Sequence, residues 1–260
     1  MDLGTTATVD KSNRNKTPLT LPEQFADTVH MDILYGANTA HGGIKYALYI
    51  VDRTTRYKYI HPLKNLTTDI LDGIKSFCSD MGTVPKRFIS DCDNRLFSSA
   101  VSDWLKDNNS QITAAPEGKQ NQNGLAEGTW RVILRMARGW IASSLLPPTY
   151  WWFAFKRAVE VSNYLPLKIN NKYTTPHELV YHEQPNLQNL LPMFSVCYIR
   201  RKTSPDDTKL KNVESHSIAV ILVGRSTVCN SPIFFHPHTH KSHHYRRLLC
   251  RRIYSCGTHL

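Results

Sequence analysis

Three carboxylates are spaced so that one metal-dependent reaction could use all of them. Asp32 lies inside an apolar, strand-like stretch, where an unpaired charge is costly to bury. Asp91 directly follows a second such stretch, and 35 residues separate it from Glu127, which we expect in the first turn of a long helix. Carboxylate oxygens suit Mg²⁺ or Mn²⁺, and two such ions can hold the attacking and leaving oxygens of a phosphodiester. The three acids together therefore favour phosphoryl transfer.

Each of these acids has an ordinary explanation when it is taken singly. An Asp in a strand can face solvent, an Asp after a strand is common in turns, and a Glu early in a helix is favoured by the helix dipole. Asp93 is a rival to Asp91, but only 33 residues separate it from Glu127. The interpretation therefore depends on the joint arrangement, with one acid in a strand, one at a strand end and one at a helix start.

Hydrophobic periodicity predicts the elements that must position these acids. Apolar and polar residues alternate in strands, whereas apolar residues recur every three or four positions in helices. Strands are expected at 28–34, 45–51, 56–63, 87–90 and 111–115, and helices at 66–81, 98–108, 123–144 and 150–164. This order predicts an α/β fold with one mixed five-stranded sheet, three antiparallel strands followed by strand–helix units, and helices on its faces.

The chain divides by composition into three parts. Residues 1–20 are polar and turn-rich, and we expect them to be a disordered lead-in. Residues 21–170 would form the catalytic core. Residues 171–260 would form a C-terminal extension, with a small β-rich module and a basic tail. The strand-like runs of this module are 195–199, 218–223 and 233–235.

The charge balance favours a polyanionic partner. Lys and Arg total 32 against 21 Asp and Glu, a net charge of +11, and residues 200–260 hold 11 of the basic residues but only 3 of the acidic ones. Nucleic acid is the commonest partner for such a distribution. No apolar run is long enough to cross a membrane. The histidines of 236–244, with Cys250 and Cys256, lack the paired spacing of a zinc finger, so we expect no zinc site.

The helix expected at 123–144 would carry a basic edge beside Glu127. At 100° per residue, three arginines fall about 20°, 40° and 80° from Glu127 around the helix axis. In this order they are Arg138, Arg131 and Arg135. Such a stripe could follow a DNA backbone away from the carboxylates, and a solvated helix face is the alternative.

A polar segment precedes this helix, between Gly118 and Gly124. It is rich in amide side chains, which can reach bases or phosphates, so we expect a loop that becomes ordered on DNA. An ordinary surface loop is the alternative. The candidate DNA ligands within it are Lys119, Gln122 and Asn123.

Five stretches of the sequence are similar to one known family. They are VHMDILYG (29–36), KYALYIVDRTTRYKYIHPLK (45–64), QNQNGLAEGTWRVILRMARG (120–139), YWWFAFKRAVEVSNYLP (150–166) and TPHELVYHEQPNL (175–187). Together with the acids and their 35-residue spacing, they resemble the D,D-35-E catalytic core of integrases from copia-type retrotransposons. The resemblance covers about residues 25–200.

This resemblance implies a ribonuclease H-like fold and a polynucleotidyl transferase that performs DNA 3′-end processing and strand transfer. It assigns catalysis and the binding of two Mg²⁺ or Mn²⁺ ions to Asp32, Asp91 and Glu127. It also implies a homo-oligomer that binds element ends and target DNA, and a chain that is one segment of a longer Pol polyprotein. Integration would take place in the nucleus, after a stage in a cytoplasmic virus-like particle, and the protein would not be secreted.

The sequence departs from the family's pattern in three places. Asp91-Cys92-Asp93 replaces Asp-Asn-Gly, Gly128 replaces the basic residue after the catalytic Glu, and the family's N-terminal zinc module is absent from these 260 residues. Two alternatives therefore stay open. One is a catalytically decayed integrase that only binds nucleic acid, and the other is a ribonuclease H-like nuclease that cleaves RNA–DNA hybrids.

Overall fold

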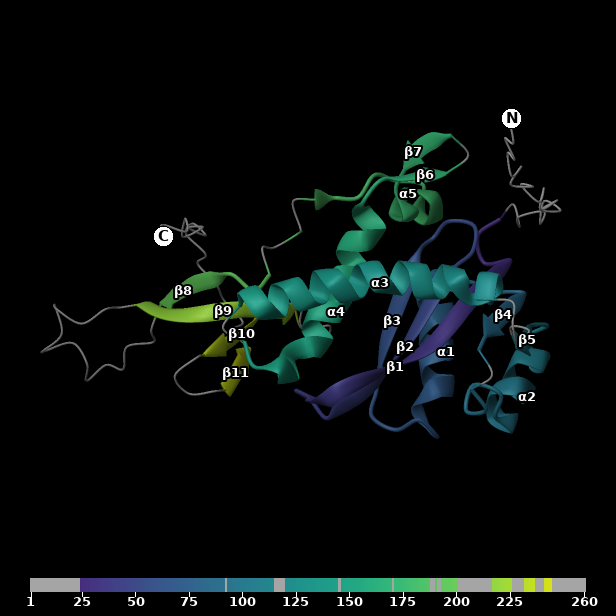
Figure 1. The fold of residues 1–260 in the computed structure, drawn as a ribbon, viewed down its shortest axis with the longest axis horizontal. Helices are drawn as coiled ribbons and strands as arrows, with labels where there is room; N and C mark the ends of the chain where they lie inside the picture. The colour runs from purple at the N-terminus through teal and green to yellow at the C-terminus, as the bar shows by residue number, and fades with distance from the viewer. Residues whose placement is uncertain are drawn as a thin grey trace, which may run out of the picture.

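A mixed sheet of five strands lies at the centre of the larger part of the chain, in the order β3-β2-β1-β4-β5 (Figure 1). The first three strands are antiparallel, and β4 and β5 join them in parallel. This confirms the predicted sheet. Its strands are β1 (Thr28–Ala40), β2 (Ile44–Asp52), β3 (Lys58–Leu63), β4 (Arg87–Ser90) and β5 (Gln111–Ala114).

The computed structural model describes most of the predicted core and parts of the C-terminal extension. The described residues are 24–91, 93–114, 120–144, 146–169, 171–187, 190, 193–200, 217–225, 232–236 and 241–244. The predicted disordered lead-in and the basic tail after residue 244 lie outside them.

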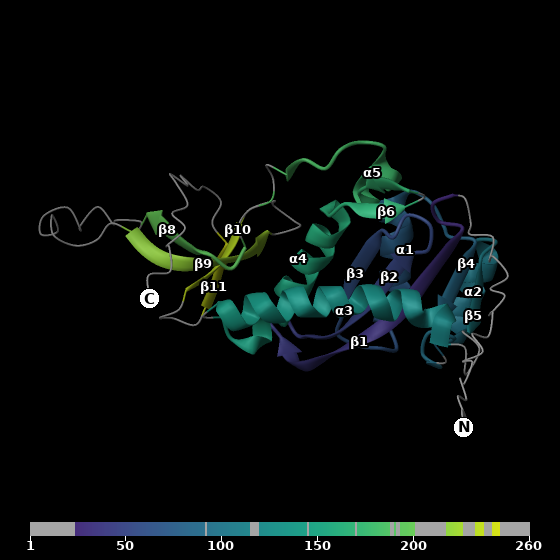
Figure 2. The same cartoon turned by 45° about the horizontal axis from the view of Figure 1, so that its top comes forward.

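Helices cover both faces of the sheet, and each face has its own apolar core. Met31 and Leu48 pack with α1 (Asp69–Met81) and α2 (Ser99–Asp107) on one face. Ala47 packs on the other face with α3 (Gln120–Ser143) and α4 (Trp151–Tyr164), which follows the 3₁₀ turn η1 (Pro148–Tyr150). Figure 2 shows α3 crossing one face with α1 behind the sheet. The two cores follow from the alternation of side chains along each strand. Among the described residues, no helix is long and apolar enough to cross a membrane.

The start of α3 differs from the prediction. The helix begins at Gln120, so Gln122 and Asn123 belong to its first turn and not to a loop, and Glu127 lies about two turns inside the helix. The residues from Gln120 to Asn123 include no proline, and the cost of about 1 kcal/mol for Gly124 within a helix is small enough to be overcome by packing. Lys119 lies outside the described residues.

A buried asparagine joins α4 to the edge of the sheet. The side chain of Asn163 accepts a hydrogen bond from the backbone N–H of Lys58 at 2.9 Å and donates one to the carbonyl of the same residue at 2.8 Å. Asn163 is 4% exposed. It therefore satisfies two backbone groups on the outer side of β3, which have no strand to pair with there.

We expect Asn163→Ala to lower the free energy of unfolding by about 2–4 kcal/mol, because it leaves a buried donor and a buried acceptor without a partner. Urea denaturation measures the change. Asn108→Ala is the matched control, since Asn108 also donates to a carbonyl, that of Trp104 at 2.8 Å, but from an exposed position. A loss at Asn163 no larger than the loss at Asn108 would contradict this role.

The C-terminal extension begins with two short elements. The prediction missed the hairpin of β6 (Leu167–Ile169) and β7 (Lys172–Thr174), whose strands of 3 residues are too short to show an alternating pattern. The predicted short helix is α5 (Pro176–Tyr181), and the Thr175 hydroxyl caps it by accepting from the backbone N–H of Glu178 at 3.0 Å.

A four-stranded antiparallel sheet follows, in the order β11-β10-β9-β8, where a small β module was predicted. Val223 and Phe235 of this sheet pack against Leu146 and Tyr150, at the entry to α4. The module is thus attached to the core through an apolar contact. Its strands are β8 (Val196–Arg200), β9 (Ser217–Arg225), β10 (Pro232–His236) and β11 (Lys241–His244).

Candidate active site

The pairing of β1 with β4 brings Asp32 and Asp91 together. The two strands are parallel, and Met31 lies opposite Ser90. The next residue of β1 is Asp32, and Asp91 directly follows the last residue of β4, so the two acids come level with each other. Asp32 accepts a hydrogen bond from the backbone N–H of Ile33 at 2.8 Å, and Asp91 accepts one from the Ser90 hydroxyl at 3.2 Å. Two carboxylates thus lie close together, one within β1 and the other directly after β4.

A hydrogen bond between β2 and α3 places Glu127 near this pair. Tyr49 is the partner of Asp32 across β1 and β2, and its hydroxyl donates to Thr129 Oγ1 at 3.0 Å. Ala126 is 1% exposed and packs in the core under the helix. Because Glu127 lies between these two anchored residues of α3, the helix carries its exposed carboxylate next to the sheet.

The pKa of Asp32 shows that the neighbouring acids repel it. The pKa of Asp32 is raised from 3.8 to about 6, first by burial and then by the charge of Asp91. The hydrogen bond from Ile33 lowers this pKa, and the charges of Glu127 and Asp93 raise it further. The acids therefore repel one another, and a cation bound between them would relieve that repulsion.

Asp93 is engaged elsewhere. It forms an ion pair with Arg95 at 2.6 Å, and the hydrogen bond from Arg95 is the main reason that the pKa of Asp93 is lowered. Arg95 also donates to the Tyr35 hydroxyl, and its guanidinium carbon lies 5.5 Å from the centre of the Tyr35 ring. Asp91 makes no such ion pair within the described part of the chain.

Comparison with known proteins gives two relatives of the same kind. The retrovirus-related Pol polyprotein from transposon RE2 of Arabidopsis thaliana is 28% identical over 159 residues, which cover 59% of this chain and 11% of the relative. The corresponding polyprotein from transposon RE1 is 24% identical over 184 residues, covering 65% of this chain and 12% of the relative. This chain therefore spans only about a tenth of the length of the curated relatives it matches. No family model matches the sequence.

Solved structures give the fold. A chain of the simian T-cell lymphotropic virus intasome, solved in complex with a PP2A regulatory subunit, superposes with a TM-score of 0.52 at 12% identity, covering 89% of this chain and 82% of that one. The HTLV-2 integrase catalytic core in complex with magnesium gives a TM-score of 0.47 at 16% identity, over 62% of this chain and 98% of that one. In sequence the chain is similar to retrovirus-related Pol polyproteins of transposons, and in fold it is similar to a chain of a retroviral intasome. The fold is ribonuclease H-like, as the resemblance implied.

The integrase-like core holds its three acids near one another without forming a closed metal site. Among the described residues, no group of three His, Cys, Asp or Glu side chains lies close enough to hold a metal ion. The donor set still fits Mg²⁺, because all the candidate ligands are carboxylates. Asp32 lies within β1 and is half-buried, whereas the side chains of Asp91, which directly follows β4, and of Glu127 are exposed.

The basic stripe of the integrase-like core lies on the surface of α3. Arg131, Arg135 and Arg138 are all exposed, whereas Ile133 and Ala137 are fully buried against the sheet. The predicted basic edge of the helix therefore lies on the exposed side, opposite residues that pack on the sheet. The role of the three arginines in DNA binding stays a prediction.

Sequence reasoning missed two sets of residues that support the site. Tyr49 and Thr129 join the sheet to α3, and Arg95, which also donates to the Tyr35 hydroxyl, holds Asp93. A tyrosine hydroxyl inside an apolar strand signals a polar partner, because a buried hydroxyl needs a hydrogen bond. The sequence had no signal that could name that partner 80 residues away.

Proposed function

We propose that this chain is the catalytic core of a retrotransposon integrase, which processes DNA 3′ ends and joins them to target DNA by metal-dependent strand transfer. One observation carries the proposal: Asp32 on β1 and Asp91, directly after the parallel strand β4, come level with each other, and the charges of Asp91 and of Glu127 on α3 both act on Asp32. Strand transfer needs several carboxylates at one point, and this fold supplies them from three separate elements. The Pol polyproteins among the relatives support the same function.

In this proposal Asp32, Asp91 and Glu127 hold two Mg²⁺ or Mn²⁺ ions. Such ions, when bound, would activate the attacking oxygen and stabilise the charge on the leaving oxygen of the phosphodiester. Strand β1 would hold Asp32 in place, and Asp91 would approach it from the end of β4. Glu127 would complete the site by rotation of its side chain. Tyr49 and Thr129 would limit how far α3 can move from the sheet.

The stripe of Arg131, Arg135 and Arg138 would position the DNA backbone along α3. Each guanidinium can neutralise a phosphate and release a bound counterion, so affinity depends on salt. By analogy with the dimeric and trimeric HTLV-2 cores and the viral intasome, the working form would be a homo-oligomer on DNA. Integration would take place in the nucleus after assembly in a cytoplasmic virus-like particle.

The test is an oligonucleotide strand-transfer assay. The protein is mixed with Mn²⁺, a labelled pre-processed DNA end and a target duplex, and joined strands are resolved on a denaturing gel. We expect products longer than the labelled strand, which disappear when the metal is chelated. No product from a folded, DNA-binding protein would contradict the catalytic proposal.

A decayed integrase is the second candidate, and one observation favours it: no three acids stand at metal-binding distance within the described residues. In that case DNA binding would persist, but no joined strands would form in Mn²⁺. Mn²⁺ would also leave the stability of the protein unchanged. A ribonuclease H-like nuclease would instead cut a labelled RNA–DNA hybrid in the same buffer.

Replacing the three stripe arginines together, as Arg131→Gln, Arg135→Gln and Arg138→Gln, is expected to weaken duplex DNA binding uniformly across sequences. The slope of log affinity against log salt should become shallower by about 0.9 for each phosphate that the protein no longer neutralises. Fluorescence anisotropy at several salt concentrations measures both quantities.

A matched control removes three exposed cations that lie away from α3, as Lys75→Gln, Arg87→Gln and Lys106→Gln. The net charge of the two variants is then equal. Equal losses of affinity and slope in both would show that only total charge matters, and would contradict a DNA path along α3.

A further inference from the structure

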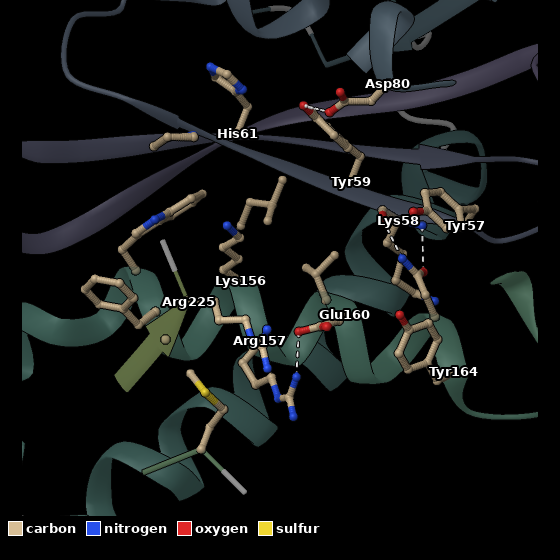
Figure 3. Close-up of a pocket in the computed structure, with 18 of the residues that line it drawn as sticks. Tyr57, Lys58, Tyr59, His61, Asp80, Lys156, Arg157, Glu160, Tyr164 and Arg225 are labelled. Atoms are coloured by element: carbon tan, nitrogen blue, oxygen red, sulfur yellow. Dashed lines mark hydrogen bonds and ion pairs between the residues drawn. The ribbon is translucent and has the colours of Figure 1, made fainter. Parts of the chain in front are cut away.

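A second concave site lies away from the three carboxylates, between β3, α4 and the C-terminal sheet (Figure 3). The cavity has a volume of about 1070 Å³, and neither Asp32, Asp91 nor Glu127 lines it. Side chains from α1, α5 and β9 complete its walls. Sites for small molecules commonly have volumes of about 300–1,000 Å³, so this space is large enough for a ligand.

The acids at this cavity already have partners. The Asp80 carboxylate accepts a hydrogen bond from the Tyr59 hydroxyl at 2.9 Å. The Glu160 carboxylate forms an ion pair with Arg157 at 2.7 Å. The wall also carries Lys58, Lys156 and Arg225, so its four lysine and arginine side chains outnumber its two acids. The cavity therefore has an excess of positive charge.

Two of these cations have no carboxylate partner among the described residues. No carboxylate oxygen there lies within 4.0 Å of the ammonium of Lys58 or Lys156. Lys58 is 4% exposed and donates to the carbonyl of Arg56 at 3.0 Å. Burial lowers the pKa of Lys58 to about 8, and burial also lowers the pKa of Lys156. An anion in the cavity would stabilise both ammonium groups.

Flat aromatic rings line the same cavity as these cations. Tyr57 and Tyr181 pack edge to face with their ring centres 5.9 Å apart, and Tyr164 packs against His177 at 5.1 Å. Tyr181 is 41% exposed, so one of its surfaces stays available for a ligand. In Figure 3, Lys156 extends from α4 toward the strand that carries His61. Aromatic surfaces next to cations are what proteins use to hold a base and its phosphate.

We propose that this cavity binds a nucleotide unit, with the base against the tyrosines of the wall and the phosphate at Lys156 and Arg225. The unit could be a free nucleotide or part of a single strand, since both offer the same chemistry. This site is separate from the candidate active site, and its occupancy does not depend on the three carboxylates or on a metal ion.

The test measures binding of a short, fluorescein-labelled oligothymidylate by anisotropy, in EDTA. The full chain carries Arg131→Gln, Arg135→Gln and Arg138→Gln, so that the stripe on α3 contributes little. We expect saturable binding that Lys156→Gln weakens about fivefold to tenfold, with the salt slope shallower by about 0.7 because one phosphate of the single strand is no longer neutralised. Tyr181→Ala should weaken binding about tenfold because it removes a stacking surface.

Lys75→Gln is the matched control, because Lys75 is an exposed cation of α1 outside the cavity, and it should leave binding unchanged.

Competition identifies the source of the nucleotide: displacement by thymidine monophosphate indicates a free nucleotide, and displacement by unlabelled oligothymidylate alone indicates a strand. Equal displacement by inorganic phosphate would overturn the role of the base. Binding that is absent, or that Lys156→Gln and Tyr181→Ala leave intact, would overturn the proposal. Strand transfer is measured separately in the wild-type protein, so either result can fail alone.

Discussion

Asp91→Asn and Glu127→Gln are each expected to lower the rate of strand transfer in Mn²⁺ by at least about 100-fold. Removing a residue that only supports a metal ligand typically costs 10-fold to 100-fold, and loss of a ligand itself should cost more. Both substitutions keep the size of the side chain and remove its charge. Joined product in the gel assay, measured over time, gives the rate for each variant.

Two further variants show whether the loss is specific. Asp107→Asn removes a carboxylate from an exposed position on α2 and should leave the rate unchanged. Asp93→Asn separates the rival assignments, because Asp93 is paired with Arg95 and should affect the rate less than Asp91. Full activity in Asp91→Asn together with no activity in Asp93→Asn would reassign the second acid to Asp93.

Asp32→Asn is expected to inactivate the protein and, at the same time, to stabilise it when no metal is present. Asp32 has its pKa raised from 3.8 to about 6 by burial and by the neighbouring acids, so the charged form is disfavoured in the folded state. At pH 8 this lowers the free energy of unfolding by about 1–2 kcal/mol. The full shift would give about 3 kcal/mol, but the group is partly open to solvent, which weakens the effect. The asparagine oxygen can still accept the hydrogen bond from Ile33.

The pH dependence follows from the same shift. The penalty is absent below about pH 4, where Asp32 is protonated in both states, and fully present above about pH 6, so stability falls as the pH rises through this window. Urea denaturation in EDTA should show a gain for Asp32→Asn at pH 8 that disappears near pH 4. Mn²⁺ should raise the stability of the wild type and have little effect on the variant.

Asp52→Asn is the control, and its expected effect on the free energy of unfolding has the opposite sign to that of Asp32→Asn. Burial raises the pKa of Asp52 as well, but its carboxylate accepts four hydrogen bonds. The donors are the backbone N–H groups of Ala26, Thr54 and Thr55 and the hydroxyl of Thr55. An amide nitrogen cannot accept, so Asp52→Asn should destabilise the protein. If both substitutions destabilised the metal-free protein equally, charge repulsion at Asp32 would be the wrong explanation.

For the five-stranded sheet and its helices, the sequence by itself determined the order of the elements and the faces they bury. The alternation around Met31 and Ile33 was enough to predict β1, and the three- and four-residue spacing in 66–81 was enough to predict α1. These signals are local, since a strand repeats every two residues and a helix about every 3.6. The short motifs that resemble the integrase family are also local, and they assigned catalytic roles to the three candidate acids residue by residue.

The tertiary structure alone decided how those acids meet. Parallel pairing sets Asp32 level with Asp91, and a hydrogen bond between Tyr49 and Thr129 holds α3, with Glu127, beside them. Both contacts join residues far apart in the chain, and sequence periodicity carries no information about register between such segments. The same reason explains why the hydrogen bond from Arg95 to Tyr35 and the cavity beside β3 became visible only in the folded chain, where packing brings distant side chains together.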